Sequence, residues 1–293
     1  MRMFNIRFLP LLIGLFSFSV FGQSTRFFVS AHQDDWQLFM NPNVYESIKN
    51  EKDKTVIIHT TAGEAGMGMG NDAYYKAREE GSLAAVRFLS NTYTTGAGLG
   101  AEMERTYVNL NNHKILRYQY RNCIVYLLRF PDGNGQGTGF ELHQFKTLAK
   151  LFDGSSRDVP TIDKSTIYKD REDLEKTIKA LILKEQARGN TEIHLADTDK
   201  KINPGDHSDH QTSSKFFQAV AKEIGEMTLY LYTNYASAQL DKNVPEEGFL
   251  VSAAAWGVNT AHIADHRHYS TWDESHNKWI GRQYFRTIRL PKK

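Results

Sequence analysis

Cysteine is almost absent from this chain of 293 residues, in which Cys123 is the only one. A single cysteine forms no internal disulfide, and it excludes every zinc module built on several thiolates. The fold must therefore be stabilised by an ordinary hydrophobic core, for which this length and a hydrophobic fraction of 40% are sufficient. Histidine, with 11 residues, is the residue type on which metal or acid–base chemistry would rest.

An excess of charge is also missing. The chain has 36 Lys and Arg against 34 Asp and Glu, and the two surplus positive charges correspond to Arg2 and Arg7. Residues 1–22 contain no other charged residue, so the remainder balances at 34 against 34. Without a basic surplus the protein has no general attraction for phosphate backbones, and we expect no nucleic-acid partner. The sequence has no internal repeat or low-complexity linker, which favours one domain over residues 23–293.

The first 22 residues have the pattern of a secretory signal peptide. Two arginines lead into the apolar run Phe8–Phe21, and Val20 and Gly22 precede a plausible cleavage site before Gln23. The run is shorter than the ~20 apolar residues that a membrane-spanning helix needs. We therefore expect residues 1–22 to be removed on export, which leaves a secreted or periplasmic protein without a stable membrane span. An uncleaved membrane anchor is the alternative.

After residue 23 the chain alternates between strand-like and helix-like segments. Short apolar runs predict buried strands, and longer stretches with apolar residues three or four apart predict helices. This alternation is typical of an α/β fold with a parallel sheet covered on both faces, whereas the middle of the chain predicts a β-hairpin and a further strand. The expected strands are Arg26–Ser30, Thr55–His59, Thr106–Leu110, Lys114–Tyr120, Cys123–Leu128, Glu192–Ala196 and, as the last clear one, Met227–Tyr232. The expected helices are Trp36–Lys49, Asp72–Leu89, Leu142–Phe152, Asp173–Leu183 and Asp209–Ile224.

Two short groups of histidine and aspartate follow predicted strands. The first is Ala31-His-Gln-Asp-Asp35, directly after Arg26–Ser30, and the second is Asp206-His-Ser-Asp-His210, in the loop after Glu192–Ala196. In open α/β sheets, ligands bind beyond the carboxyl ends of the strands, where both groups lie. Imidazole and carboxylate together are the ligand set of a divalent transition metal such as zinc. The two groups therefore predict a three-ligand metal site with one position open for water.

Each group alone also has an ordinary structural explanation. A His and an Asp that are close in sequence often share a surface hydrogen bond, and Asp209 is a reasonable N-cap for the helix that follows. The two groups together, each after a buried strand, favour the metal site. The residues by themselves do not decide which of Asp34 and Asp35 is the metal ligand.

The AHxDD motif with a distant HxDH motif resembles the de-N-acetylases that act on N-acetylglucosaminyl-phosphatidylinositol and the bacterial LmbE-like proteins. Thr60–Glu64, the helix with Arg78 and Glu80, and Phe130–Gly133 agree with it, so the resemblance covers most of residues 26–235. It implies a Rossmann-like α/β fold and one metal ion, Zn²⁺ or another divalent ion such as Fe²⁺. The activity it implies is hydrolysis of N-acetyl groups on amino sugars.

The resemblance also assigns roles to residues of the two motifs. The zinc ligands that it implies are His32, Asp35 and His210. Asp34 would be the general base, and a protonated His207 would stabilise the oxyanion or protonate the leaving amine. Asp209 is expected to hold His207 in place. Zinc in such a site lowers the pKa of water and polarises the amide carbonyl.

Three positions depart from the commoner form of the motifs. Gln33, Trp36 and Ser208 stand where Pro, Glu and Pro are usual, and none of the three is an implied ligand. Trp36 either alters substrate preference or packs into the core. The glycine-rich loop Gly63–Gly70 lacks the Gly-Lys-Ser/Thr ending of a phosphate loop, so we expect no nucleotide there. Asp132 either contacts sugar hydroxyls or belongs to a plain turn.

The sequence thus predicts an exported zinc-dependent amide hydrolase whose partner is an N-acetylated sugar or glycoconjugate. One alternative is an amidase or esterase for a non-sugar substrate, because this fold does not determine the acyl acceptor. The other is a non-catalytic, metal-containing glycan-binding protein. We expect a structural role for His59, His143 and His194, and the sequence indicates no oligomeric state. A solvated or substrate-lining segment, instead of a second metal site, is expected for His262, His266, His268 and His276.

Overall fold

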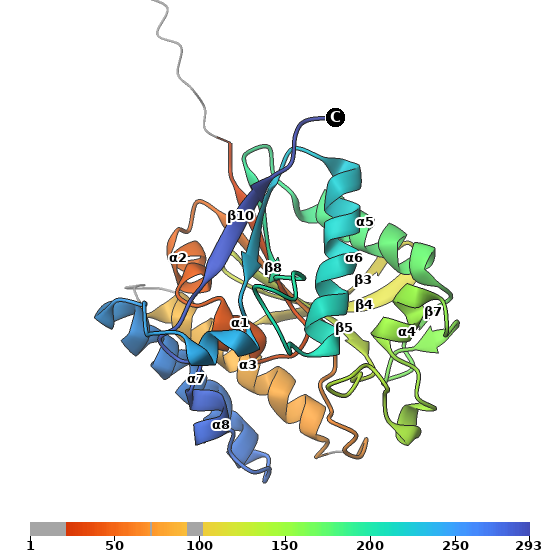
Figure 1. Cartoon of the computed structure of the whole chain (residues 1–293), viewed down its shortest axis with the longest axis horizontal. Helices are drawn as coiled ribbons and strands as arrows, with labels where there is room; N and C mark the ends of the chain where they lie inside the picture. Colours follow the sequence, from red (N-terminus) through yellow and green to blue (C-terminus); the bar gives the residue numbers. More distant parts are fainter. Residues whose placement is uncertain (1–21, 71, 93–101) are drawn as a thin grey trace, which may run out of the picture.

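The computed structural model describes residues 22–70, 72–92 and 102–293, so the predicted signal peptide lies outside the described residues except for Gly22 (Figure 1). An eight-stranded sheet has the order β10-β9-β8-β1-β2-β5-β4-β3. Its strands are β1 (Thr25–Ser30), β2 (Lys54–Thr61), β3 (Glu104–Leu110), β4 (His113–Tyr120), β5 (Cys123–Phe130), β8 (Thr191–Ala196), β9 (Thr228–Tyr232) and β10 (Phe285–Arg289). The short strands β6 (Val159–Pro160) and β7 (Ile167–Tyr168) pair separately.

Five neighbouring strands of the sheet are parallel, and their order reverses at β1. On one side of β1 lie β2 and then β5, and on the other side lie β8 and then β9. This is the 3-2-1-4-5 order of a Rossmann-like sheet, whose ligand crevice lies at the carboxyl ends of the strands where the order reverses. The predicted α/β class is therefore confirmed. The predicted hairpin is also present, as β3 and β4, and it extends the sheet beyond β5 in antiparallel pairing.

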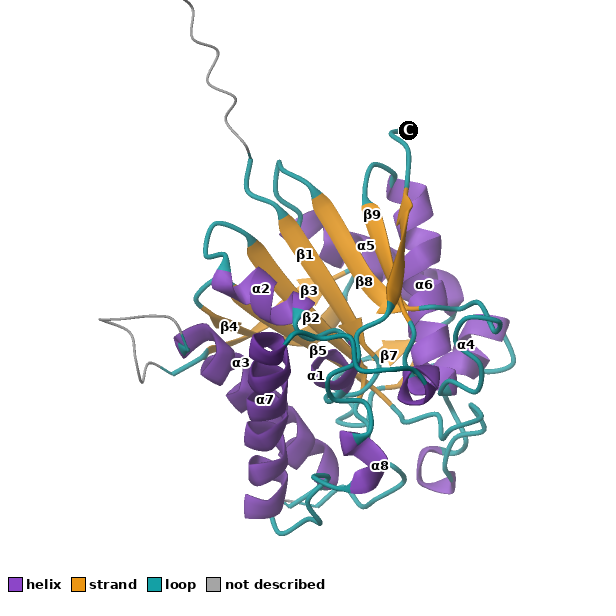
Figure 2. Cartoon of the chain, turned by 60° about the vertical axis from the view of Figure 1, so that its left-hand side comes forward, coloured by secondary structure: helices purple, strands orange, loops and turns teal. Residues whose placement is uncertain are grey.

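Helices cover both faces of the sheet, because neighbouring residues of a strand point to opposite faces and both sets are apolar. The α-helices are α1 (Asp35–Phe39), α2 (Asn43–Lys49), α3 (Tyr74–Asn91), α4 (Leu148–Asp153), α5 (Arg171–Glu185), α6 (Ser208–Ile224), α7 (Glu246–Asp265) and α8 (Glu274–Asn277). Phe27 and Val29 of β1 belong to a core that includes residues of α4, α5 and α6, whereas Phe28 belongs to a core that includes residues of α1, α2, α3 and α7. Figures 1 and 2 show these two groups of helices on the two faces of the sheet. Two 3₁₀ turns are η1 (Glu141–His143) and η2 (Tyr235–Gln239).

Two of the predicted helices are interrupted. The stretch Trp36–Lys49 divides into α1 and α2, and Pro42, which has no N–H to continue a helix, stands at the N-cap of α2. The stretch Leu142–Phe152 keeps only α4 as an α-helix. Gln144 and Phe145 take left-handed backbone conformations, with φ of 54° and 56°, and these end the turn η1.

The C-terminal region contains elements that the sequence did not predict, and α7 and β10 are the longest helix and the strand among them. α7 packs along α3 (Figure 2), and β10, labelled in Figure 1, pairs with β9 as the antiparallel edge strand. The buried face of α7 includes Ser252, Asn259 and Thr260, so apolar spacing does not mark this face. β10 is mostly exposed, so it lacks the apolar run of a buried strand. Within the described part of the chain, no helix combines the length and the apolar content that crossing a membrane requires.

Candidate metal centre

Both His/Asp motifs lie where the strand order of the sheet reverses. β1 ends at Ser30, and its motif continues directly into α1, whose first residue is Asp35. β8 ends at Ala196, and the loop that follows leads to α6, which begins at Ser208. Because β1 and β8 are parallel neighbours, their carboxyl ends bring together two motifs that are distant in the sequence.

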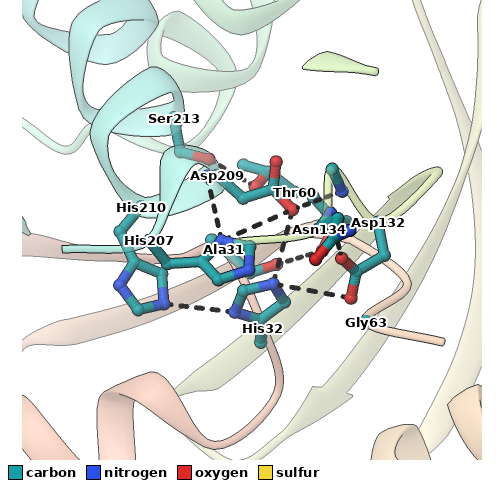
Figure 3. Close-up of polar contacts among 12 residues, drawn as sticks. Ala31, His32, Thr60, Gly63, Asp132, Asn134, His207, Asp209, His210 and Ser213 are labelled. Atoms are coloured by element: carbon teal, nitrogen blue, oxygen red, sulfur yellow. Dashed lines mark hydrogen bonds and ion pairs between the residues drawn. The ribbon is translucent and has the colours of Figure 1, made fainter. Parts of the chain in front are cut away.

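Three side chains of these motifs converge on one point. His210 Nε2 lies 3.1 Å from His32 Nδ1 and 3.0 Å from Asp35 Oδ1, and the last two atoms are 3.6 Å apart. Nitrogen and oxygen ligands at ~2.0–2.1 Å from a tetrahedral zinc lie about 3.3 Å from one another, so this spacing fits one ion. All three residues are buried. The structure thus brings together the three predicted ligands, two of which are drawn in Figure 3.

A carboxylate lies behind each of the two histidine rings. His210 Nδ1 is 2.8 Å from Asp206 Oδ1, and both side chains are almost completely buried. His32 Nε2 is 3.4 Å from Asp209 Oδ2 and 3.8 Å from Asp132 Oδ2 (Figure 3). Carboxylates in this position select the tautomer of a metal-binding histidine and hold its ring in place. No sequence pattern assigned this role to Asp206, although the residue opens the second motif.

A second group of potential ligands overlaps the first and consists of His32, Asp132, His207 and Asp209. Its separations, of 3.4, 3.8 and 3.9 Å, are wider on average than the 3.0, 3.1 and 3.6 Å of the first group. Its carboxylates already accept backbone N–H groups, Asp209 from Gly133 and Asp132 from Asn134, both at 2.8 Å. His32 Nε2 and Asp209 Oδ1 are nevertheless buried without a hydrogen-bond partner among the described residues. We therefore take the first group as the candidate metal centre and the second as its support.

The electrostatics of the first group favour positive charge. Burial opposes protonation of His32 and His210, but the surrounding carboxylates, Asp35 first among them, together outweigh it and raise both pKa values well above the ordinary histidine value. Burial likewise opposes ionisation of Asp35, yet the two imidazoles hold its pKa well below the usual range. The same arrangement attracts a divalent cation, whose binding displaces these protons.

Asp34 lies beside the three potential ligands and is paired with Arg78 of α3. Arg78 Nη2 donates to Asp34 Oδ1 at 2.5 Å, and Nη1 donates to the carbonyl of Gly63 at 2.7 Å. Gly63 has a φ of 58°, and a Cβ there would lie 2.6 Å from Arg78 Nη1, so this contact requires glycine. Burial opposes the charge of Arg78, but Asp34 raises its pKa and keeps it protonated. Arg78 thus orients Asp34 and holds the glycine-rich loop at the site.

His207 stands at the N-cap of α6, where its Nδ1 accepts the backbone N–H of Asp209 at 3.1 Å. The alternative in which Asp209 caps this helix is therefore wrong. The Asp209 carboxylate accepts from Gly133 and lies closer to His32 than to His207. Burial, together with the positive charges of His32 and His210, lowers the pKa of His207 to about 2. The His207 ring is therefore a neutral donor through Nε2–H, in contrast to the protonated ring that we expected.

A cavity of about 220 Å³ opens beside the centre. Among the residues that line it, the polar ones include Asp34, Tyr74, Arg78, Asp132 and His207. The apolar ones include Leu38, Phe39, Tyr235 and Trp279. Tyr235 and Trp279 lie after the last predicted strand, and no sequence pattern connected them with the motifs. A larger hollow of about 1500 Å³ lies at the amino edge of the sheet, but none of the predicted site residues lines it.

Several residues that the sequence singled out lie away from the centre. Trp36 is fully buried and donates to Ser82 Oγ at 2.9 Å, so it is a core residue and does not line the cavity. His59 contacts the same hydroxyl at 3.1 Å, and His194 contacts the Tyr232 hydroxyl at 2.8 Å. These contacts agree with the structural role expected for both histidines.

The C-terminal histidines do not gather into a second metal site. None of the potential ligand groups found among the described residues includes His262, His266, His268 or His276. His266 contacts Glu80 and His268 contacts the carbonyl of Asp72, both at 2.7 Å. Of these four histidines only His276 lines the cavity, so it alone contributes to the wall of the site.

Comparison with known proteins adds a distant likeness of fold. No protein-family model and no curated protein sequence matches this chain. Among solved structures it is similar to N,N′-diacetylchitobiose deacetylase from Pyrococcus horikoshii, with 11% identity over 90% of this chain and 84% of that chain, and a TM-score of 0.45. It is also similar to a conserved protein from Thermus thermophilus, with 16% identity over 84% of this chain and 79% of that chain, and a TM-score of 0.37. Both likenesses concern the fold alone.

Proposed function

We propose that this chain is a zinc-dependent amide hydrolase of the LmbE-like type, which removes the acetyl group from an N-acetylated sugar or glycoconjugate. One observation carries the proposal. His32 Nδ1, Asp35 Oδ1 and His210 Nε2 lie within 3.6 Å of one another beside a cavity that Asp34 and His207 also line. This donor set suits zinc or another divalent transition metal such as Fe²⁺. When bound, the metal supplies a Lewis acid for the amide carbonyl and lowers the pKa of water.

Asp34 is the residue placed to take the proton of the attacking water. It lines the cavity next to Asp35, and Arg78 holds its carboxylate in one orientation. A purely structural metal site does not need a second carboxylate beside its ligands. The position of Asp34 therefore favours catalysis over the non-catalytic glycan-binding alternative.

His207 is the residue placed to stabilise negative charge on the reacting oxygen. Its Nδ1 is occupied by the N–H of Asp209, which leaves Nε2–H as the donor of a ring that lines the cavity. A neutral imidazole donates this hydrogen bond but, unlike an imidazolium ion, it is not an acid that protonates the leaving amine. The proton that the leaving amine needs then comes from Asp34, which received it from water.

The test of this proposal is acetate release by the metal-loaded protein from a panel of N-acetyl sugars. We expect release from at least one of them, lost with EDTA and restored by Zn²⁺. N-acetyl amino acids and acetate esters in the same panel test the amidase and esterase alternative. Glycan binding by the metal-loaded protein without release of acetate from any compound would overturn the catalytic proposal.

We further propose that residues 1–22 are removed on export and that residues 23–293 act as one domain in the periplasm or outside the cell. The support is the basic start and the short apolar run before Gln23. Mass spectrometry of the exported protein should find an N-terminus near Gln23. An intact Met1 in a membrane fraction would indicate an anchor instead.

A further inference from the structure

The cavity beside the metal centre has two sides of different chemistry. On one side, Arg78 pairs with Asp34 and lies 5.6 Å from the ring of Tyr74. Asp132 belongs to the same side, because its carboxylate accepts the N–H of Ala65 at 3.3 Å, in the loop that Arg78 also contacts. Hydroxyl groups of a sugar find both donors and acceptors there.

The other side is an aromatic wall, which we define as Phe39, Tyr235 and Trp279. Trp279 stacks on Tyr235 with 4.9 Å between ring centroids and 16° between planes, and it meets Phe39 edge-on at 5.3 Å. The indole Nε1–H donates to the carbonyl of Tyr235 at 3.2 Å, so the ring is held in this position. Leu38 lies beside these rings in the lining of the cavity.

The aromatic wall reaches the metal centre directly. The rings of Tyr235 and Phe39 lie 5.2 Å and 6.0 Å from the ring of His210, which is one of the three potential ligands. A group bound to the centre through a carbonyl oxygen therefore meets the wall on one side and Arg78 and Asp132 on the other. An acyl group has no hydrogen-bonding atom beyond its carbonyl, so burial against apolar rings suits it. It offers no hydrogen-bond partner to the polar side chains of Arg78 and Asp132 on the other side.

We infer that the aromatic wall binds the acyl group of the substrate and that Trp279 restricts this group to about the size of acetyl. This inference rests on the proposed function, because it assigns the two sides of a scissile amide to the two sides of the cavity. The whole cavity holds about 220 Å³, below the range of ~300–1000 Å³ found for sites of larger ligands, so little of it remains for an acyl group once a sugar lies on the polar side. Trp279 is the rigid boundary, since its exposed fraction is only 8% and two rings support it.

The first experiment compares kcat/KM for N-acetyl-, N-propionyl- and N-butyrylglucosamine. One methylene group in a closed apolar pocket changes kcat/KM by about 10- to 200-fold, so the wild type should prefer acetyl over butyryl by at least tenfold. Trp279→Ala should shift this ratio toward butyryl by about tenfold or more. Trp272→Ala is the matched control, because Trp272 lies in the same C-terminal region, is 48% exposed and does not line the cavity. It should leave the ratio unchanged.

The second experiment needs no turnover. Calorimetry measures the binding of acetohydroxamate and butyrohydroxamate to the zinc-loaded wild type and to both variants, and the same shift toward the longer acyl chain is expected in Trp279→Ala. If Trp279→Ala does not fold by circular dichroism, Leu38→Ala opens the same side of the cavity from α1 and should give the same direction of change.

The outcomes separate this inference from the proposed function. Equal losses of kcat/KM for short and long acyl chains in Trp279→Ala would overturn the assignment of the acyl group to the aromatic wall. A loss of kcat/KM that depends on the sugar and not on the length of the acyl chain would also overturn it, and it would indicate that the sugar ring lies on the wall. If no amide is hydrolysed but the hydroxamate ratio shifts as expected, the proposed function fails while the acyl-binding wall stands.

Discussion

Asp206→Asn tests the metal centre without removing a ligand. Asp206 Oδ1 lies 2.8 Å from His210 Nδ1, and Oδ2 accepts from Asn203 at 2.8 Å and from Gln211 at 3.1 Å. Both oxygens of the carboxylate thus receive N–H donors. An asparagine has one oxygen and one NH₂ group, so it must turn its NH₂ toward a donor on one side. The substitution keeps the shape of the side chain and breaks the support of the His210 ring.

The expected effect is a loss of zinc affinity. Removing an outer carboxylate from a metal-binding histidine costs about 10- to 100-fold in affinity, which corresponds to about 1.4–2.8 kcal/mol. We expect the upper part of this range, because the Asp206 side chain is 0% exposed and water does not reach it to replace the lost contact. Folding should change less, since the size and packing of the side chain are retained.

The assay is competition for Zn²⁺ between a chromophoric chelator and the purified metal-free protein at constant pH. Asp199→Asn is the matched control, because Asp199 lies in the same loop, is exposed, and accepts the N–H of Lys201 through Oδ1. It should bind zinc as the wild type does. A zinc affinity of Asp206→Asn within about twofold of wild type would refute the role of this carboxylate, and a wild type that binds no zinc would refute the centre itself.

Four further predictions follow from the same structure. Asp34→Asn should keep bound zinc and lower kcat by about 10²–10⁴-fold, as measured by metal analysis beside steady-state kinetics; loss of zinc would make Asp34 a ligand. His207→Ala should also keep zinc and lower kcat more than it raises KM, because its contact forms mainly in the transition state, and a rise in KM alone would contradict this. Burial lowers the pKa of His59 to about 4, whereas the pKa is about 6.5 in the unfolded chain. The contribution of the neutral ring to the free energy of unfolding is therefore fully present above pH 6.5. As pH falls from about 6.5 to 4, this contribution to the free energy of unfolding is lost at about 1.4 kcal/mol per pH unit. Urea unfolding at several pH values measures this dependence, and His59→Gln should remove the part that His59 causes. An equal pH dependence in wild type and variant would show that His59 is not its source. Arg286→Ala removes a cation that lies 2.6 Å from the fully buried Asp197 carboxylate, and because Arg286 is 43% exposed we expect a free energy of unfolding lower by about 1–3 kcal/mol. A loss below about 0.5 kcal/mol in urea unfolding would be typical of an ordinary surface position and would contradict the importance of this pair.

Local patterns were sufficient to predict the central strands and the position of the motifs. The five parallel strands were predicted to within two residues at each end, because a buried strand is an apolar run bounded by polar residues. The ligand set could be proposed for the same reason, since each motif directly follows or closely follows such a run. The interrupted helices show the limit of periodicity. The spacing of apolar residues continues past Pro42 and through Gln144 and Phe145, although the backbone at those residues does not continue a helix.

The sequence by itself therefore determined the α/β class, the five parallel strands and the two motifs that supply the candidate ligands. Only the tertiary structure decided that β1 and β8 are neighbours and that Asp206 supports His210. It also placed the Asp209 carboxylate near His32 and brought Trp279 from the C-terminal region to the cavity. The physical reason is that strand formation depends on residues within one short window. Contacts between distant side chains depend instead on how all strands and helices pack, because a shift of one strand or helix moves every side chain that it carries.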